Sequence, residues 1–426
     1  MLKNRYIAVV VLLLSIVFTS TAQSPYSMFG YGTLDDCTLG INSGMGGVGY
    51  AINNKMQVNP KNPASYAAMD SLTFLFDIGM SLETDWVKEK TNAGTLRETK
   101  TSANFDYAVA QFPIGKHFAA SFGIMPFSRV NYSYNGNILN GEKSNYGEGG
   151  IHQVYVGAAA KLYKNLYLGV NASFLFGTIT HSTTVLPSSS YNVVAMIDQS
   201  RMHITDYKFD FGIRYTQEIN DKNLITIGAV YSPKKKLLGK RYNDLYQLET
   251  SGETSFSVES DTISLKSCYE MAETYGVGLG YKWDERLILG LDFTYQPWSK
   301  ADYLPLIKRE YTKDMLKGNF NDRYRVSFGA EYKNAVYSTK YFDRMRFRAG
   351  AYYERSYMKI QGSDLNEMGA TVGLGLPILK DKSIINLSAQ YYHRKLSTNN
   401  KLVENGLLIS VGISFNEFWF FKRKIE

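Results

Sequence analysis

The sequence of 426 residues is poor in the residue types that build most catalytic and metal centres. Its 2 cysteines and 5 histidines form neither a Cys-x-x-Cys nor a His-Glu-x-x-His motif, and a Gly-x-Ser-x-Gly nucleophile elbow is missing. A Ser-His-Asp site assembled from separate strands would leave no such motif. Cys37 and Cys268 can pair in an oxidising compartment, but nothing brings them together, which favours two free or buried thiols. We predict that the protein is not an enzyme and needs no cofactor.

Long hydrophobic runs are scarce as well. The clearest run, 7–18, follows the basic residues Lys3 and Arg5 and precedes the small residues Ser20-Thr21-Ala22. It is shorter than the roughly 17–25 residues with which a helix spans a bilayer. The pattern predicts a secretory signal peptide, 1–22. We therefore expect an exported mature chain, in which no apolar run approaches the length of a transmembrane helix.

Aromatic residues and glycine are abundant, with 33 Tyr, 23 Phe and 36 Gly beside an ordinary hydrophobic content of 44%. The formal charge of +8 becomes 8 − 2 = +6 once the two basic residues of the signal peptide are removed. Chains rich in Tyr and Gly with weak hydropathy suit strands that face lipid on one side and water on the other. Soluble β-sandwiches share part of this composition, so composition alone leaves both classes open.

Apolar and polar residues alternate along many segments after residue 71. In 207–215, for example, Tyr, Phe, Phe, Ile and Tyr alternate with Lys, Asp, Gly and Arg, and 324–332 repeats the pattern. This period of two predicts β-strands. Several segments approach or exceed about ten residues, which is longer than a usual soluble strand and long enough for a tilted membrane strand. We therefore predict an all-β chain that forms a transmembrane antiparallel β-barrel in 71–416, with its apolar faces against lipid.

Short and long links alternate between the predicted strands. Outer-membrane barrels have short periplasmic turns and longer external loops. Six short and seven long links predict about 14 strands, with both termini in the periplasm and the protein in the cell outer membrane. A further strand-like stretch, 254–266, would break the alternation, so we expect a hairpin within an external loop. The predicted long links are 87–102, 135–149, 185–200, 233–270, 300–320, 358–366 and 397–403.

The segment 23–70 lacks strand periodicity and is rich in Gly, Asn and Pro. Its apolar residues, among them Met45 and Val48, favour a plug inside the lumen over a segment that hangs in the periplasm. Within it, 44–49 matches the dinucleotide-binding pattern G-x-G-x-x-G. That pattern binds a pyrophosphate only between a buried strand and a helix, and neither is predicted here. We therefore expect a plug without a nucleotide site.

A ladder of charged side chains is expected to face the lumen from two neighbouring strands. It is either an ion-pair belt that stiffens the lumen or a binding site for an acidic group, and we favour the belt. A separate basic run, 234–236 with Lys240 and Arg241, is either a loop that contacts lipopolysaccharide or a solvated loop. Nucleic acid is not an expected partner in this compartment. The ladder consists of Arg323, Arg325, Glu331, Arg344, Arg346 and Arg348.

Pro126 interrupts the otherwise regular strand 118–134, three residues after Gly123. Proline cannot donate a hydrogen bond to a neighbouring strand and occurs at sheet edges and bulges. The residue therefore predicts either a lateral gap in the wall or a harmless bulge at the membrane rim, and this pattern alone leaves both open.

Several motifs recur in an order that is typical of one family. The N-terminal part contains a glycine-rich turn and an Asn-Pro element, in the residues Gly44, Gly46, Gly47, Gly49, Asn59, Pro60, Asn62, Pro63 and Ala64. Tyr231-Ser232-Pro233 leads to Gly239, a hairpin follows in 276–298, and 323–332 and 348–350 continue the series. Together they resemble the long-chain fatty-acid transporter (FadL/TodX-type) family of outer-membrane barrels. The resemblance covers the family's hatch and most of the C-terminal half, whereas the middle of the chain is similar only in pattern.

The resemblance implies a barrel of fourteen strands, an N-terminal hatch and a kinked third strand with a side opening. Since Pro126 lies in the third predicted strand, the resemblance favours a lateral gap lined by Gly123 and Pro126. It also implies a channel that takes up hydrophobic compounds similar to long-chain fatty acids and releases them laterally into the membrane.

Two features depart from that family. The recognisable lumenal positions are polar, small or arginine, and the chain ends in an aromatic and basic tail, 417–426, similar to relatives in the Bacteroidota. Such a tail suits docking to a partner in the periplasm. We therefore keep an alternative, a non-transporting subunit or scaffold of an outer-membrane protein assembly or secretion complex. The docking residues would be Phe418, Trp419, Phe420, Lys422, Arg423 and Lys424.

Overall fold

The computed structural model describes residues 24–52, 54–70, 73–91, 94–188, 194–248, 255–305, 312–335, 338–378, 383–398 and 402–418. The predicted signal peptide, 1–22, lies outside the described residues. So does the predicted tail from residue 419 onward, with five of its six predicted docking residues: Trp419, Phe420, Lys422, Arg423 and Lys424.

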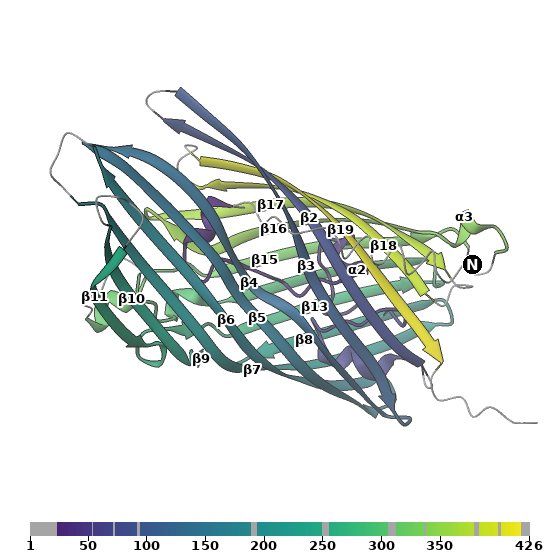
Figure 1. Ribbon diagram of the computed structural model, residues 1–426. Coiled ribbons are helices and arrows are strands. Elements are labelled where there is room, and N and C mark those ends of the chain that lie inside the picture. The colour runs from purple at the N-terminus through teal and green to yellow at the C-terminus, as the bar shows by residue number, and fades with distance from the viewer. Residues whose placement is uncertain are drawn as a thin grey trace, which may run out of the picture.

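The described chain is an all-β protein whose wall is a closed antiparallel barrel of 14 strands, as predicted. Each strand pairs with its neighbours in chain order, and the last strand closes on the first from Leu402↔Glu89 to Phe418↔Thr73 (Figure 1). The wall strands are β2 (Thr73–Thr91), β3 (Gly94–Ile114), β4 (Phe118–Ile138), β5 (Gly141–Tyr163), β6 (Leu166–Pro187), β7 (Met196–Asn220), β8 (Asn223–Ser232), β13 (Thr274–Trp283), β14 (Leu287–Gln296), β15 (Arg323–Lys333), β16 (Arg346–Ile360), β17 (Ser363–Ile378), β18 (Ser383–Leu396) and β19 (Leu402–Phe418).

The outer face of the wall is apolar because every second side chain of a strand points away from the lumen. On β13, Val277 and Leu279 are 52% and 48% exposed. Exposed aromatic rings, Tyr275 and Trp283, lie near the two ends of this strand. Eight residues at ~3.3 Å each, tilted by ~40°, span roughly 20 Å, close to the ~25 Å apolar band of outer-membrane barrels. The barrel therefore lies in the outer membrane, with lipid against this band.

Among the described residues there is no helix with the length and hydropathy of a membrane span.

One side of the barrel is much taller than the other, as the long strands at the upper left of Figure 1 show. The strands β2–β7 have 19 to 25 residues, whereas β8, β13, β14 and β15 have 10 or 11. Three predicted external loops, 87–102, 135–149 and 358–366, are therefore wrong, because strands run through them almost to the turn. Beyond the bilayer both faces of a strand meet water, so the apolar alternation disappears while the backbone pairing continues.

The external excursion between β8 and β13 contains the predicted hairpin. It consists of β10 (Gly239–Leu248) and β11 (Ser255–Ser264), which pair with each other, and β10 also pairs with the upper part of β7. The short strands β9 (Lys235–Lys236) and β12 (Glu270–Met271) pair beside it. The prediction that this stretch is an external hairpin and not a wall strand is confirmed.

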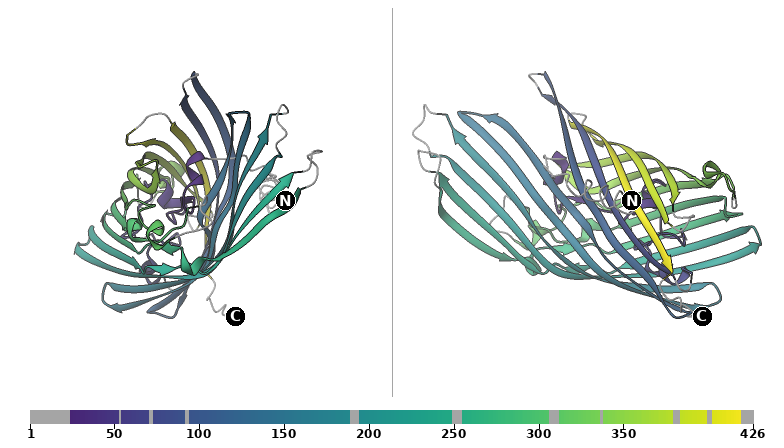
Figure 2. Two further views of the ribbon diagram at one scale, coloured as in Figure 1. Left: turned by 90° about the vertical axis from the view of Figure 1, so that its left-hand side faces the viewer. Right: turned by 45° about the vertical axis from the view of Figure 1, so that its right-hand side comes forward.

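The N-terminal segment, residues 24–70, lies within the barrel (purple in Figure 2). It contains few regular elements: η1 (Pro25–Met28), β1 (Thr33–Leu34), α2 (Gly40–Ser43) and η2 (Pro63–Ala68). The backbone of this segment lies in close contact with the wall. A Cβ on Gly350 would overlap the backbone nitrogen of Gly46, and a Cβ on Gly329 would overlap the Met45 carbonyl oxygen. Glycine at these wall positions is therefore required by the close approach of the segment.

The external loops fold over the external end of the lumen. There they contact the N-terminal segment through a group of buried aromatic rings. The rings of Tyr31 and Trp298 lie 5.8 Å apart, and Trp298 is 4.9 Å from Tyr357. We call this group the aromatic cap. It consists of Tyr31, Tyr269, Trp298, Tyr303, Phe320 and Tyr357. Short helices in these loops are η3 (Leu265–Ser267), η4 (Trp298–Lys300) and η5 (Lys313–Leu316).

Candidate functional site

The wall is interrupted between β3 and β4. Their ladder runs only from Ala108↔Ile124 to Ile114↔Phe118, although both strands continue beyond it. The interruption begins next to Pro126, which has no N–H to donate, and a bulge in the β4–β5 ladder follows before Ser128. Sequence reasoning singled out this place, and Gly123 lies in the last paired stretch before the break.

Beyond the break, the edge of β4 is no longer paired with β3, and the N-terminal segment lies against this edge. Thr33 and Leu34 form β1, which pairs antiparallel with Arg129 and Ser128. The Asp35 backbone N–H donates to the Phe127 carbonyl at 2.9 Å. Ser27 Oγ further donates to the carbonyl of Asn131 and accepts from its N–H, both at 3.2 Å. A segment from elsewhere in the chain thus takes the place of the missing neighbour, as β-strand addition does between proteins.

Charged side chains bridge the two sides of the break. Arg129 on β4 pairs with Asp106 on β3 at 2.9 Å and with Asp35 of the N-terminal segment at 3.6 Å. Burial raises the pKa of Asp35 to about 6, while Arg129 opposes that rise. Lys100 on β3 donates to the carbonyl of Ser133 on β4 at 3.0 Å. We call Arg129, Asp106 and Asp35 the latch, because they connect both strands and the segment between them.

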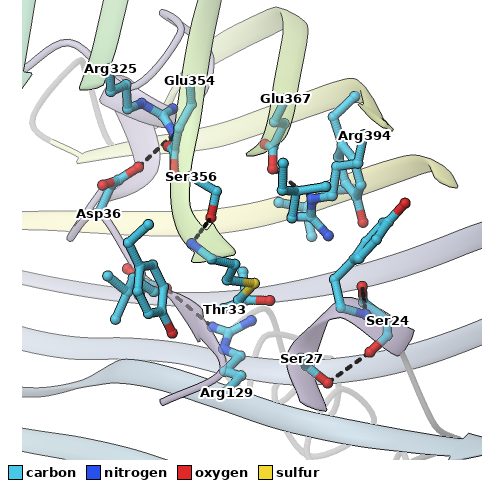
Figure 3. Close-up of a pocket in the computed structure, with 18 of the residues that line it drawn as sticks. Ser24, Ser27, Thr33, Asp36, Arg129, Arg325, Glu354, Ser356, Glu367 and Arg394 are labelled. Atoms are coloured by element: carbon cyan, nitrogen blue, oxygen red, sulfur yellow. Dashed lines mark hydrogen bonds and ion pairs between the residues drawn. The ribbon is translucent and has the colours of Figure 1, made fainter. Parts of the chain in front are cut away.

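Two polar cavities lie behind the latch and share Asp35 and Arg129 in their walls. Their volumes are about 160 and 70 Å³, whereas ligand pockets usually measure about 300–1,000 Å³. Figure 3 shows charged and hydroxyl side chains pointing into the larger cavity from several strands, among them Arg394, Glu367 and Glu354. Space of this size and polarity fits water better than an apolar ligand.

Most of the predicted charge ladder forms buried ion pairs. Glu331 accepts from Arg346 at 2.8 Å and from Arg348 at 2.6 Å. Arg323 and Arg325 both pair with Glu354 of β16, at 2.7 and 3.0 Å.

Asp36 of the N-terminal segment joins this belt. It lies 2.7 Å from Arg323 and 2.6 Å from Arg325. Burial alone would raise the pKa of Asp36, but the two guanidinium groups outweigh it and hold the pKa well below its ordinary value. The belt thus connects the wall to the segment inside it.

Arg344 is not part of the belt, and that prediction is wrong. It lies in α3 (Tyr341–Arg344), a single helical turn in a periplasmic link, with its guanidinium 5.7 Å from the Tyr341 ring. The strand β16 begins only at Arg346, so the alternation that predicted an inward Arg344 stops before it.

The predicted hatch residues fold the N-terminal segment back on itself. Asn59 Nδ2 donates to the Gly49 carbonyl at 2.7 Å, and Asn62 Nδ2 donates to the Tyr50 carbonyl at 2.7 Å. Asn62 also caps η2, in which Pro63 is the first residue, by accepting from the Ala64 N–H at 3.0 Å.

Sequence reasoning missed the wall residue that holds this fold. Asp292 of β14 accepts from the N–H groups of Gly49 and Tyr50, at 2.7 and 3.1 Å, and lies 3.6 Å from Lys61. The signal in the sequence that could have identified Asp292 is its inward position in an alternating strand.

Part of the predicted basic run is paired or buried. Lys234 pairs with Glu270 at 2.7 Å, Lys235 pairs with Asp206, and Arg241 is buried. Lys236 and Lys240 are exposed, so a contact with lipopolysaccharide stays a prediction. At the other end of the chain, β19 continues through Phe418, so the predicted start of the tail at residue 417 is wrong.

Cys37 and Cys268 are both thiols and are not joined in a disulfide, as the sequence favoured. Cys37 lines the smaller cavity beside Asp106 and Arg129, and burial raises the pKa of its thiol to about 12. Among the described residues there is no group of three or more His, Cys, Asp or Glu side chains placed to hold a metal ion.

Because Cys37 lines the cavity beside the latch, the reactivity of its thiol measures whether the latch is closed. We expect Arg129→Gln to raise the rate at which a water-soluble maleimide labels Cys37 by at least about threefold, because loss of the latch exposes the cavity by local opening. Labelling is followed by mass spectrometry at pH 8, with buried Cys268 as the internal reference. Arg97→Gln, which removes an exposed arginine from β3, is the matched control. Equal rates in the two variants would show that the latch does not close the cavity.

The comparisons with known proteins agree on the fold. A Pseudomonas aeruginosa FadL homologue is 12% identical with a TM-score of 0.63, and the match covers 90% of this chain and 99% of that one. The Ralstonia pickettii toluene transporter TbuX is 16% identical with a TM-score of 0.58, covering 89% and 98%. The P. putida toluene transporter TodX is 14% identical with a TM-score of 0.56, covering 93% and 100%.

No curated protein matches the sequence. The family model described as BamG matches residues 1–426, which is the whole chain. This outer-membrane barrel with a FadL/TodX-type fold therefore belongs to the BamG family.

Proposed function

We propose that this chain is a non-transporting barrel subunit of an outer-membrane protein assembly complex. The observation that carries the proposal is the packing of the lumen, where the N-terminal segment packs with the external loops in one buried cluster and with the wall in two others. A barrel of this kind offers its partners a rigid body fixed in the membrane, and its two polar cavities of about 160 and 70 Å³ are smaller than usual ligand pockets.

The external end supports this proposal because hydrogen bonds join the loops to the N-terminal segment. Tyr31 Oη donates to the Glu270 carbonyl at 3.0 Å, and Tyr303 Oη donates to the Gly30 carbonyl at 3.0 Å. Tyr357 Oη donates to the Gly32 carbonyl at 2.5 Å. An entry route through the aromatic cap would have to break these bonds and separate rings packed about 5 Å apart.

The middle of the lumen supports it through electrostatics. A hydrophobic ligand would replace water or protein around buried charges such as Arg348, Glu331 and Arg323, and uncompensated burial of charge is costly. Ligand sites are lined mainly by apolar side chains with a few polar groups. The belt and the cavities behind the latch have the opposite composition.

The family match supports the assembly role over other scaffold roles, because the BamG designation covers the whole chain and points to assembly. The tall external wall formed by β2–β7 adds a large surface outside the bilayer, on which another protein can lie.

Depletion of the chain in its native cell tests the proposal. We expect the amounts of other outer-membrane barrels to fall at least about twofold, while the uptake of a labelled long-chain fatty acid stays unchanged. Quantitative proteomics of the outer membrane gives the first readout. Mild-detergent purification should yield the chain with stoichiometric outer-membrane proteins and without bound lipid in the lumen. A chain that purifies alone, with an apolar ligand inside and no effect on other barrels, would contradict the proposal.

Uptake of hydrophobic compounds by lateral release is a second candidate, because the β3–β4 ladder is interrupted beside Pro126. The matched structures described as toluene transporters also support it, although at 14–16% identity they share the fold alone. In this account Gly123 and Pro126 line the exit, and the latch opens during transport. Arg129→Gln with Asp35→Asn would then raise uptake of an apolar compound, whereas in a non-transporting subunit it would leave uptake unchanged.

A further inference from the structure

The periplasmic rim of the barrel carries aromatic rings that lie beside basic side chains. The short turns mark this rim, since the long external strands and loops lie at the other end. The rings of Trp283, Tyr332 and Tyr341 are exposed there by 38%, 40% and 47%. Among the described residues, six cation–ring contacts lie at this rim: Lys161 with Tyr167, Arg214 with Tyr167, Lys164 with Tyr163, Arg286 with Trp283, Arg286 with Tyr332, and Arg344 with Tyr341.

Arg286 is the most distinctive of these basic residues. Its guanidinium carbon lies 5.9 Å from the rings of both Trp283 and Tyr332, and Nη2 donates to Tyr332 Oη at 3.2 Å. It makes no ion pair among the described residues, and its Nε has no hydrogen-bond acceptor there. The nearby carboxylate of Glu285 pairs with Lys282 at 3.1 Å. A cation held between two rings without a counter-ion can accept an anion from outside the protein.

The position of Arg286 decides which anion reaches it. Trp283 and Tyr332 stand where the apolar band ends, at the level of lipid headgroups. Leu287, which pairs with Tyr332 in the β14–β15 ladder, continues this surface into the lipid-facing wall. An anion bound here therefore has its polar part beside the arginine and an apolar part against the barrel. A phospholipid has this form, with an anionic phosphate and apolar acyl chains.

We propose that Arg286, with the rings of Trp283 and Tyr332, binds the phosphate of an anionic glycerophospholipid in the inner leaflet of the outer membrane. Lipopolysaccharide belongs to the opposite leaflet, and free phosphate lacks the acyl chains that would cover the apolar surface beside Leu287. The site is independent of the proposed assembly role, because it depends only on the orientation of the barrel in the membrane.

The test uses the full chain reconstituted into liposomes of equal phosphatidylcholine and phosphatidylglycerol. After transfer to mild detergent, native mass spectrometry counts the lipids that stay bound. We expect the wild type to retain phosphatidylglycerol about fivefold over phosphatidylcholine, and Arg286→Gln to lose most of this preference. Arg97→Gln, which removes one exposed arginine from the external part of β3, should retain it.

Folding is checked for each variant by its heat-modifiable migration in gels, so that a misfolded variant is not mistaken for one that has lost the site. A wild type that binds both lipids equally would overturn the proposal. A folded Arg286→Gln variant with an unchanged preference for phosphatidylglycerol would also overturn it. So would a preference that a 50-fold excess of inorganic phosphate removes while the packing of the lipids is unaffected.

Discussion

Replacing Glu331 with glutamine is expected to lower the free energy of unfolding of the barrel by about 3–5 kcal/mol. Its carboxylate is 3% exposed and accepts from both Arg346 and Arg348. Removing the charge leaves two guanidinium groups without their counter-ion, and the Arg348 side chain is only 1% exposed. Leaving a buried charge without compensation costs far more than losing an ion pair on the surface.

The measurement is reversible urea unfolding of protein refolded in detergent micelles, followed by tryptophan fluorescence. Glu285→Gln is the matched control, because that glutamate is exposed and, among the described residues, its ion pair is with Lys282 at 3.1 Å. We expect the control to change stability by less than about 1 kcal/mol. Equal losses in the two variants would show that the lumenal belt does not stabilise the barrel.

Replacing Gly350 with valine is expected to make a non-conducting barrel conduct ions. A side chain on this residue would overlap the backbone of Gly46 and Met45, so the N-terminal segment must leave its place against the wall. Gly350 lies in the β15–β16 and β16–β17 ladders, where valine is compatible with strand pairing. The wall therefore still forms, while the lumen loses part of its filling.

Single-channel recording in planar bilayers measures this effect. We expect stepwise currents from Gly350→Val and none from the wild type. Gly136→Val is the control, because a Cβ there would meet nothing within 4 Å. If folded Gly350→Val stays silent, or if the control conducts equally, the N-terminal segment is not what closes the lumen.

The wall could be predicted from sequence because the bilayer imposes a rule on each strand. Between Tyr275 and Trp283 every second residue must be apolar, and this leaves a pattern that can be read directly. Outside the bilayer the rule no longer applies. In the upper part of β3, residues 94–99 are exposed on both faces, so the strand continues without any alternation that would predict it.

The candidate site could be predicted only in part. Pro126 identified the place where the wall breaks, because the missing N–H is a local property of one residue. The latch that bridges the break joins Asp35, Asp106 and Arg129 from three separate parts of the chain. No spacing in the sequence brings them together, since their proximity depends on how the N-terminal segment packs inside the closed barrel.

Arg344 and Arg394 illustrate the limits of periodicity. The alternation of β16 predicts that Arg344 faces the lumen, but β16 begins at Arg346 and Arg344 lies in the helical turn before it. Arg394, which pairs with Glu367 at 2.5 Å and with Glu404 at 2.8 Å, was missed although it is inward on β18. Its partners lie on the two neighbouring strands, so only the ladder register reveals the cluster.

Uptake of radiolabelled oleate tests whether the lumen is closed and the barrel does not transport. The full chain is expressed in a Gram-negative host that lacks its own FadL-type transporter, and its folding in the outer membrane is verified by heat-modifiable migration. We predict uptake no higher than in the empty host, while a FadL-type transporter expressed in parallel restores it. If the folded chain restored uptake to the level of that transporter, the lumen would be open to a fatty acid and the barrel would be a transporter.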